Sequence, residues 1–175
     1  AMAQGNSTVT VIGTVAKGDA SSLSVKGEND SAVEAFKLAP TVLVVRNRPA
    51  TLADIKPNDF VASAAVRKED GKLHSTELRI SPEAMRGLGE DQRPMNDARH
   101  QTMTNATVAG TAIVGGSNSL TVKFPGGQSE LIVDPGVPVT KIEPVDKAMV
   151  KAGAKVRVRG TKTPDGIVAS SITLQ

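Results

Sequence analysis

The chain carries one pattern of strands and turns twice, and this duplication limits its possible folds more than any other feature. Residues 8–80 and residues 104–175, called here the first and second repeat, share the order of their turn glycines and alternating apolar side chains. A common backbone would constrain both kinds of position, since glycine serves turns and alternation decides which side chains face a core. We therefore predict two copies of one β module, joined by a connector at residues 81–103 and preceded by a flexible segment at residues 1–7.

The two repeats can be aligned with few gaps. A shift of 97 residues needs no gap through the first hairpin, where it sets Val11, Gly13, Thr14, Gly18, Leu23, Val25 and Lys26 against Val108, Gly110, Thr111, Gly115, Leu120, Val122 and Lys123. After a shorter loop the shift becomes 95, so that Pro40, Val42, Val44, Val61 and Asp70 meet Pro135, Val137, Val139, Val156 and Asp165. The matches predict that both repeats use the same turns and the same inward-facing positions.

Each repeat is predicted to form five short strands with one helical turn. In the first repeat, β-branched alternation predicts strands at 8–15, 23–26, 41–46, 60–67 and 73–80. Gly13 predicts a bulge or a close approach of backbones, and Pro40 predicts an interruption of the ladder. Thr51 and Asp54 have the spacing of a capping box before Pro57. The sequence thus predicts an all-β chain with two tandem five-stranded OB-like barrels, each with one short helical turn.

A family resemblance agrees with this layout. The first repeat contains G-T-V…S-L-S-V-K, L-x-x-I-K-P-N-D-F-V and D-G-K…L-R-I, and the second contains V-K-A-G-A-K-V-R-V-R-G and D-G-I-V-A-S-S-I-T-L. These motifs resemble an uncharacterised bacterial family of OB-like β-barrel repeats, over about 145 residues and without the connector. The resemblance implies a fold and a bacterial envelope setting, and it carries no functional residues. Ala65 stands where the second repeat has Gly160, so strand four of the first repeat is expected to end differently.

Composition argues against catalysis and for mutual support of the repeats. The chain has three Phe, no Trp, no Tyr and no Cys, so each core must be built from aliphatic side chains without a disulfide. A module of about 60–70 residues buries little of its surface, so the repeats are expected to stabilise each other. His74 and His100 are the only histidines, and no nucleophile, phosphate-binding or dinucleotide motif accompanies them. We therefore expect no enzyme, and we interpret His74 as a polar residue on a strand face.

The connector is the chemically distinct part of the chain. It holds Met95, His100 and Met103, and thioether and imidazole groups are ligands that select Cu(I). The simpler interpretation is that the methionines pack between the modules and His100 lies on the surface, so no cofactor is expected and copper remains the alternative. Glu90, Asp91 and Asp97 lack the regular spacing of a calcium loop. Residues 82–86 are expected to open one helical turn, with Pro82 at its first position.

A basic stripe is the second candidate site. Lys155, Arg157 and Arg159 alternate with valines and should therefore share one face of a strand. Such a stripe can follow the backbone of a nucleic acid, although the simpler interpretation is a solvated strand face. Single-strand sites also stack bases on aromatic side chains, and this chain has few. Nucleic acid is therefore an unlikely partner, and a net charge of +3 adds little attraction.

The function predicted from these features is non-enzymatic binding, with an unknown protein or other partner of the bacterial cell envelope. A groove lined by the connector is the expected contact surface, while copper handling and oligonucleotide binding are the alternatives. Ala1-Met2-Ala3 before Gln4 fits either a cleaved leader or an expression remnant, so a periplasmic or secreted location is expected. No apolar run reaches the roughly 18–20 residues that span a bilayer. Composition does not decide the oligomeric state.

Overall fold

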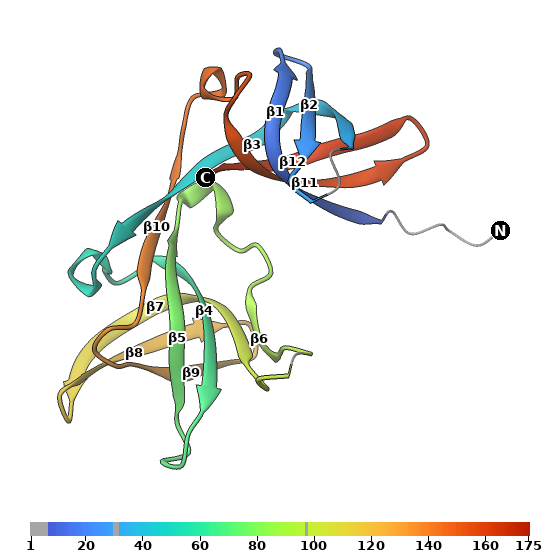
Figure 1. Cartoon of the computed structure of the whole chain (residues 1–175). Coiled ribbons are helices and arrows are strands. Elements are labelled where there is room, and N and C mark those ends of the chain that lie inside the picture. The colour runs from blue at the N-terminus through green and yellow to red at the C-terminus, as the bar shows by residue number, and fades with distance from the viewer. Residues whose placement is uncertain (1–6, 30–31, 97) are drawn as a thin grey trace. The chain divides into compact units, whose positions relative to one another are not determined.

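The computed structural model describes residues 7–29, 32–96 and 98–175, and it is all-β as predicted (Figure 1). The expected leader at Ala1–Ala3, and all but Ser7 of the expected flexible segment, lie outside the described residues. The strands are β1 (Thr8–Gly18), β2 (Ser22–Gly27), β3 (Val33–Ala50), β4 (Phe60–Arg67), β5 (Leu73–Ser81), β6 (Asp91–Pro94), β7 (Thr102–Val114), β8 (Ser117–Phe124), β9 (Gly127–Val133), β10 (Val139–Pro144), β11 (Lys155–Thr163) and β12 (Gly166–Leu174). Three short 3-10 helices are η1 (Leu52–Asp54), η2 (Glu83–Met85) and η3 (Lys147–Met149). Within the described ranges, no helix is long and apolar enough to cross a membrane.

The chain divides into two compact units that do not follow the repeat boundaries. The first unit contains residues 1–47 and 143–175, and the second contains residues 48–142. The first unit therefore combines the start of the first repeat with the end of the second. The second unit combines the remaining parts of both repeats with the whole connector.

In the first unit, five strands form a closed ring. β1 pairs with β2, β2 with β3, β3 with β12, β12 with β11, and β11 with β1. The β3–β12 pair is parallel and the other four are antiparallel. The ring encloses an apolar core made of Val15, Leu23, Val25, Phe36, Val42, Val44, Val156, Val158, Ala169 and Ile172.

The second unit forms the same ring, here from the first three strands of the second repeat and the last two strands of the first repeat. β7 pairs with β8, β8 with β9, β9 with β5, β5 with β4, and β4 with β7, and the β5–β9 pair is parallel. β10 extends the parallel pairing, since Val139 lies opposite Leu78 on β5. The enclosed core consists of Ile55, Val61, Ala65, Leu73, Leu78, Ile80, Ala106, Val108, Leu120, Leu131, Val133 and their neighbours Val122 and Val139.

The expectation of two tandem barrels, each built from one repeat, is therefore wrong. The strands form rings in which strands one to three of one repeat pair with strands four and five of the other. We call this arrangement the hairpin exchange. Its physical basis is that both repeats present equivalent strand edges, so each three-stranded sheet can accept either terminal hairpin. β3 runs on for 18 residues instead of turning back to its own β4.

The pairings that close the two rings are equivalent residue by residue. One further slip of a residue, to a shift of 94, sets Leu78 of the first repeat against Ile172 of the second. Ile172 lies opposite Val44 in the first unit, and their counterparts Leu78 and Val139 lie opposite each other in the second. A bulge follows Arg159 on β11 and Ala64 on β4, which are also counterparts. At each bulge, one residue of the neighbouring strand has no pairing partner, and its hydroxyl donates a hydrogen bond across the bulge. Ser170 donates to the Arg159 carbonyl and Thr76 donates to the Ala64 carbonyl, both at 3.1 Å. Strand four therefore has the same irregularity in both repeats, despite Ala65 standing for Gly160.

The alignment of the first strand also needs correction. Val15 lies opposite Val25 and is followed by a bulge, while Val108 lies opposite Val122 and is followed by a bulge. Val15 is thus the counterpart of Val108, a shift of 93 residues and not 97. The reason is that the β7–β8 hairpin is longer at its tip than the β1–β2 hairpin. The match of Gly18 to Gly115 had assumed that the two turns have equal length. The matches of Leu23, Val25 and Lys26 to the second repeat agree with the pairing.

Some of the local predictions for the first repeat are confirmed and others are not. The Thr51–Asp54 capping box is confirmed, with the Thr51 amide donating to the Asp54 carboxylate at 2.9 Å. Pro40 does not end a strand, because β3 continues through it. It does interrupt the pairing, since the β3–β12 register jumps from Leu38 to Leu43. Gly13 marks a close approach of backbones, as expected, because a Cβ there would lie 2.0 Å from the Lys26 carbonyl oxygen.

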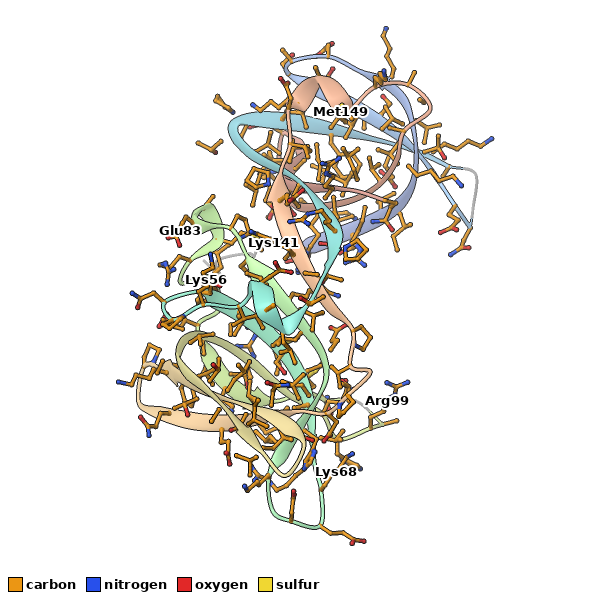
Figure 2. The ribbon with its side chains drawn as sticks, turned by 90° about the vertical axis from the view of Figure 1, so that its left-hand side faces the viewer. Lys56, Lys68, Glu83, Arg99, Lys141 and Met149 are labelled. Carbon is orange, nitrogen blue, oxygen red and sulfur yellow. The ribbon has the colours of Figure 1, made fainter. Side chains whose placement is uncertain are left out.

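The connector is folded onto the second unit. η2 begins after Pro82, as predicted, and β6 pairs antiparallel with residues 102–105 of β7. Arg86 donates to the Thr107 hydroxyl at 3.5 Å, and the Asn105 amide donates to the Gly89 carbonyl at 3.2 Å. Figure 2 labels Glu83, whose carboxylate holds the Arg86 side chain at 2.7 Å. The connector therefore lies along β7 on the outside of the ring.

Candidate functional site: a basic outer face on the first unit

β11 places three cationic side chains on the outside of the first unit. Val156 and Val158 are fully buried in the core, so the residues between and beside them point outward. Lys155 and Arg159 are exposed and Arg157 is half-buried. The predicted candidates thus share one face of β11 and lie about 7 Å apart along the strand.

Neighbouring strands extend this basic face. Thr14 on β1 lies between Lys26 of β2 and Lys155 of β11, so one row across three strands carries two amines and a hydroxyl. Arg159 lies between two further hydroxyl residues, Thr10 and Ser171. A hollow of about 450 Å³ opens beside the first row and is lined by Ile12, Gly13, Thr14, Lys26, Gly27, Glu28, Lys155 and Gln175. Sequence reasoning missed Lys26, because only the sheet register brings it beside Lys155.

The cations of this face form no ion pair with an acid that the structure describes. No acid among the described residues bridges Lys26, Lys155, Arg157 or Arg159. Glu28 is the only acidic side chain among the described residues that line the hollow. Cationic groups that no protein acid neutralises are available to an external anion, and their attraction is strongest at low ionic strength.

The equivalent face of the second unit has a different character. The counterparts of Lys155, Arg157 and Arg159 on β4 are Phe60, Ala62 and Ala64, and Phe60 is buried at 3 % exposure. There the connector lies alongside, tied to β7 through its hydrogen bonds from Arg86 and to Gly89. The two repeats thus share a backbone plan, while only the first unit has a charged and open face. Positions at which the repeats differ identify this site better than those at which they agree.

A second polar cluster lies on the outside of the second unit. His74 is buried, and its Nδ1 lies 2.7 Å from Asp134 while its Nε2 lies 2.8 Å from Asp70. Ser117 donates to the other oxygen of Asp134 at 2.8 Å. Lys68, labelled in Figure 2 at the turn between β4 and β5, approaches Asp134 at 3.8 Å. His74 lies on a strand, as predicted, and it is also the centre of a clamp that ties the β4–β5 turn to the end of β9.

The clamp does not have the geometry of a nucleophilic triad. Both ring nitrogens of His74 face carboxylates, so neither is free to accept a proton from a serine. Ser117 points at Asp134 instead. The hydrogen bond that the His74 ring donates to the Asp134 carboxylate, together with that to Asp70, raises the pKa of His74 above its usual value, although burial opposes the shift. The same contacts lower the pKa values of Asp134 and Asp70.

These shifts predict a pH dependence of the second unit. A raised His74 pKa stabilises the fold below the unfolded value near 6.5, and this contribution is lost as pH rises through the folded value. Depressed aspartate pKa values act oppositely and lose their contribution only below pH 3.8. We expect the melting temperature to fall by a few degrees between pH 6 and pH 8.5. His74→Gln should remove most of that difference, and an unchanged profile would contradict it.

The three residues considered for copper lie at the hairpin that joins β6 to β7. The Met95 amide donates to the Gln101 carbonyl at 2.7 Å, and Met103 lies opposite Arg93. Met95 and Met103 are half-buried, while His100 is exposed with a φ of 53°. No group of three or more His, Cys, Asp or Glu residues able to hold a metal ion occurs among the described residues. Asp97, considered for calcium, lies outside them.

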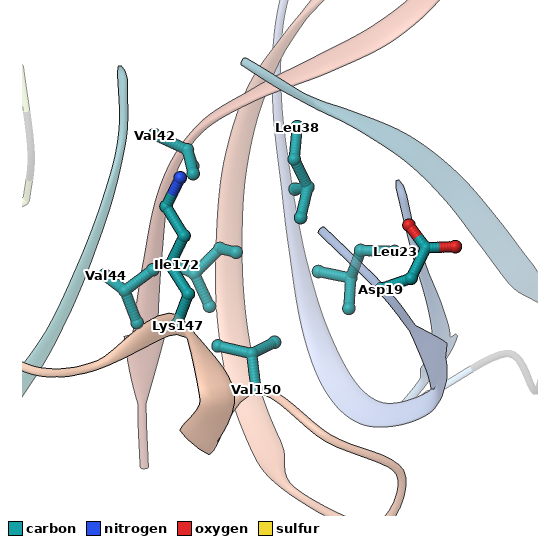
Figure 3. Close-up of a pocket in the computed structure, with 8 residues that line it drawn as sticks. All are labelled: Asp19, Leu23, Leu38, Val42, Val44, Lys147, Val150 and Ile172. Carbon is teal, nitrogen blue, oxygen red and sulfur yellow. The ribbon is translucent and has the colours of Figure 1, made fainter. Parts of the chain in front are cut away.

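A small cavity at one end of the first barrel offers little room for a ligand. Figure 3 shows the side chains of Leu23, Leu38, Val42, Val44, Val150 and Ile172 around it. Lys147 lies at its edge and donates its amine to the Pro40 carbonyl at 3.2 Å. The cavity measures about 20 Å³, which is room for about one water molecule. It is an imperfection of the apolar core and not a binding site.

Comparison with known proteins gives no relative for this chain. No family model matches it, and neither the curated proteins nor the solved structures contain a significant match.

Proposed function

We propose that this protein is a non-enzymatic binding protein whose first unit holds an extended acidic polysaccharide on its basic outer face. The observation that carries the proposal is the set of four cations, Lys26, Lys155, Arg157 and Arg159, on adjoining strands without ion pairs to any described acid. Hydroxyl side chains between them supply donors and acceptors suited to sugar groups.

The barrel type supports the same proposal. Each ring has five strands, a parallel pair between its third and fifth strands, and a short helical turn before its fourth. We interpret this as the OB type, as the sequence predicted. Barrels of that type bind oligosaccharides and oligonucleotides on the face of their second and third strands and on adjoining loops, and of the four cations Lys26 lies on the second strand.

A polysaccharide fits the face better than a nucleic acid does. Phe36 is buried in the first core, and Phe60 and Phe124 belong to the second unit. The basic face therefore offers no aromatic platform, and base stacking of about 1–3 kcal/mol per base is unavailable. The envelope setting implied by the family resemblance remains a prediction that agrees with such a partner, and no observation favours copper handling.

Charge reversal tests the proposal. We expect polygalacturonate to bind the protein in 50 mM salt, and Arg157→Glu with Arg159→Glu to weaken that binding at least about tenfold. With about three or four contacts, affinity should fall roughly thirtyfold between 50 and 200 mM salt if the polymer behaves as a single strand does. Lys56→Glu with Lys123→Glu makes the same change in net charge on the second unit and should have little effect. Equal losses in both double variants would contradict the assignment.

A further inference from the structure

Within the described part of the first unit, no strand pairs with one edge of β1 at its start. β1 pairs with β11 over residues 8–14, but its pairing with β2 begins only at Gly13. On the β2 side, the described residues supply a single further bond before that point, from the Glu28 amide to the Ile12 carbonyl. Residues 8–11 therefore present an unpaired strand edge, which is a template for another strand.

The second unit shows the same edge occupied. By the corrected alignment, residues 9–12 of β1 are the counterparts of residues 102–105 of β7. Those residues of β7 pair with β4 on one side and with β6 on the other. Met103, the counterpart of Thr10, lies opposite Arg93 of β6. The fold thus accepts an added antiparallel strand at this position in one unit and leaves the position open in the other.

The open edge has space and charge beside it. A hollow of about 250 Å³ lies along it, lined by Thr10, Val11, Ile12, Gly27, Glu28, Asn29, Ala32 and Glu34. Glu28 and Glu34 are the charged members of that lining, so the hollow favours a cationic side chain. Ile12 is 44 % exposed at its rim and would gain an apolar neighbour.

We propose that the β1 edge at residues 8–11 is a docking site for a basic, extended peptide segment of a partner protein, which adds as an antiparallel strand. Backbone hydrogen bonds to Thr8 and Thr10 supply the attachment, as in other cases of strand addition. The carboxylates of Glu28 and Glu34 select a basic side chain, and β6 shows the register. This site adjoins the basic face, because the two hollows share Ile12, Gly27 and Glu28.

Amide exchange on the full chain provides the test. The flanking bonds from Val15 to Ala154 and from Lys162 to Ser7 place the Thr10 amide away from β11, whereas the Val11 amide faces β11. We expect Thr10 to exchange rapidly in the free protein. The synthetic peptide Lys-Val-Thr-Val-Lys-Val-Thr should slow it at least tenfold and leave Val11 unchanged, while the peptide with Glu in place of Lys should not.

Two variants keep the outcome decisive. Glu28→Lys with Glu34→Lys should weaken binding of the basic peptide at least tenfold, whereas Glu69→Lys with Glu90→Lys on the second unit should not. Thr10→Pro removes the amide that faces the edge and should abolish the protection that the peptide gives to Thr8. A Thr10 amide already protected in the free chain would overturn the proposal, since the chain or a second copy would then cover the edge. Equal binding of both peptides would overturn the charge assignment.

Discussion

Gly13→Ala is expected to destabilise the first unit by about 3 kcal/mol, at the upper end of typical costs for overpacking. A Cβ at this position would lie 2.0 Å from the carbonyl oxygen of Lys26 and 2.8 Å from its carbonyl carbon. Both atoms belong to the backbone of β2, so no side-chain rotation relieves the clash. The pairing of β1 with β2 must instead move or break. Chemical unfolding followed by far-UV circular dichroism measures the loss, since the chain has neither Trp nor Tyr.

Gly110→Ala is the matched control for this substitution. The ungapped alignment sets Gly110 against Gly13, but a Cβ at Gly110 would meet nothing within 4 Å. The true counterpart of Gly13 is Ala106, which already carries a Cβ in the second core and is fully buried. We therefore expect Gly110→Ala to change stability little. Equal costs at Gly13 and Gly110 would contradict the corrected register.

Most of the local structure followed from the sequence, because it depends on short-range rules. The turn residues on either side predicted β4 at its observed bounds, and the capping box predicted η1. Turn glycines were less reliable. Gly18 and Gly115 lie in hairpins of different length, so matching them shifted the first strand by four positions.

The hairpin exchange was beyond such rules. A pattern of alternation states which side of a strand faces a core, but not which of two equivalent edges the strand pairs with. Since both repeats offer the same edges, sequence alone left the choice of partner open. The basic stripe could be predicted, because it depends only on alternation within one strand. The exchange could not, because it depends on which strands pair. Lys26 joins it only through the register of β1 with both neighbours.

The His74 clamp was missed because its parts are distant in sequence. Asp134 follows β9 and lies 60 residues from His74. A lone histidine on a strand carries no signal of two carboxylates arriving from different turns. The sequence does place Asp70 four residues before His74, but an acid at that distance from a histidine is common in hairpins and does not indicate a contact.

The hairpin exchange predicts which engineered cysteines can form a disulfide. Ile12 lies opposite Arg157, in a pair of residues that the flanking bonds mark as not hydrogen-bonded to each other. Cα atoms of such pairs lie about 4.5 Å apart, within the roughly 4.4–6.8 Å that a disulfide needs. Ala62 is the counterpart of Arg157 in the first repeat, and it would face Ile12 if each repeat formed its own barrel. In the structure Ala62 lies opposite Asn105 instead.

The most direct test of the exchange compares three double variants of a chain that has no native cysteine. Ile12→Cys with Arg157→Cys and Ala62→Cys with Asn105→Cys should each form a disulfide within one chain under mild oxidation. Ile12→Cys with Ala62→Cys should remain reduced, although the second variant shows that a thiol introduced at position 62 can react. Mass spectrometry of tryptic peptides without reduction reads the outcome. A disulfide between positions 12 and 62, with none between 12 and 157, would show that each repeat closes its own barrel and would contradict the exchange.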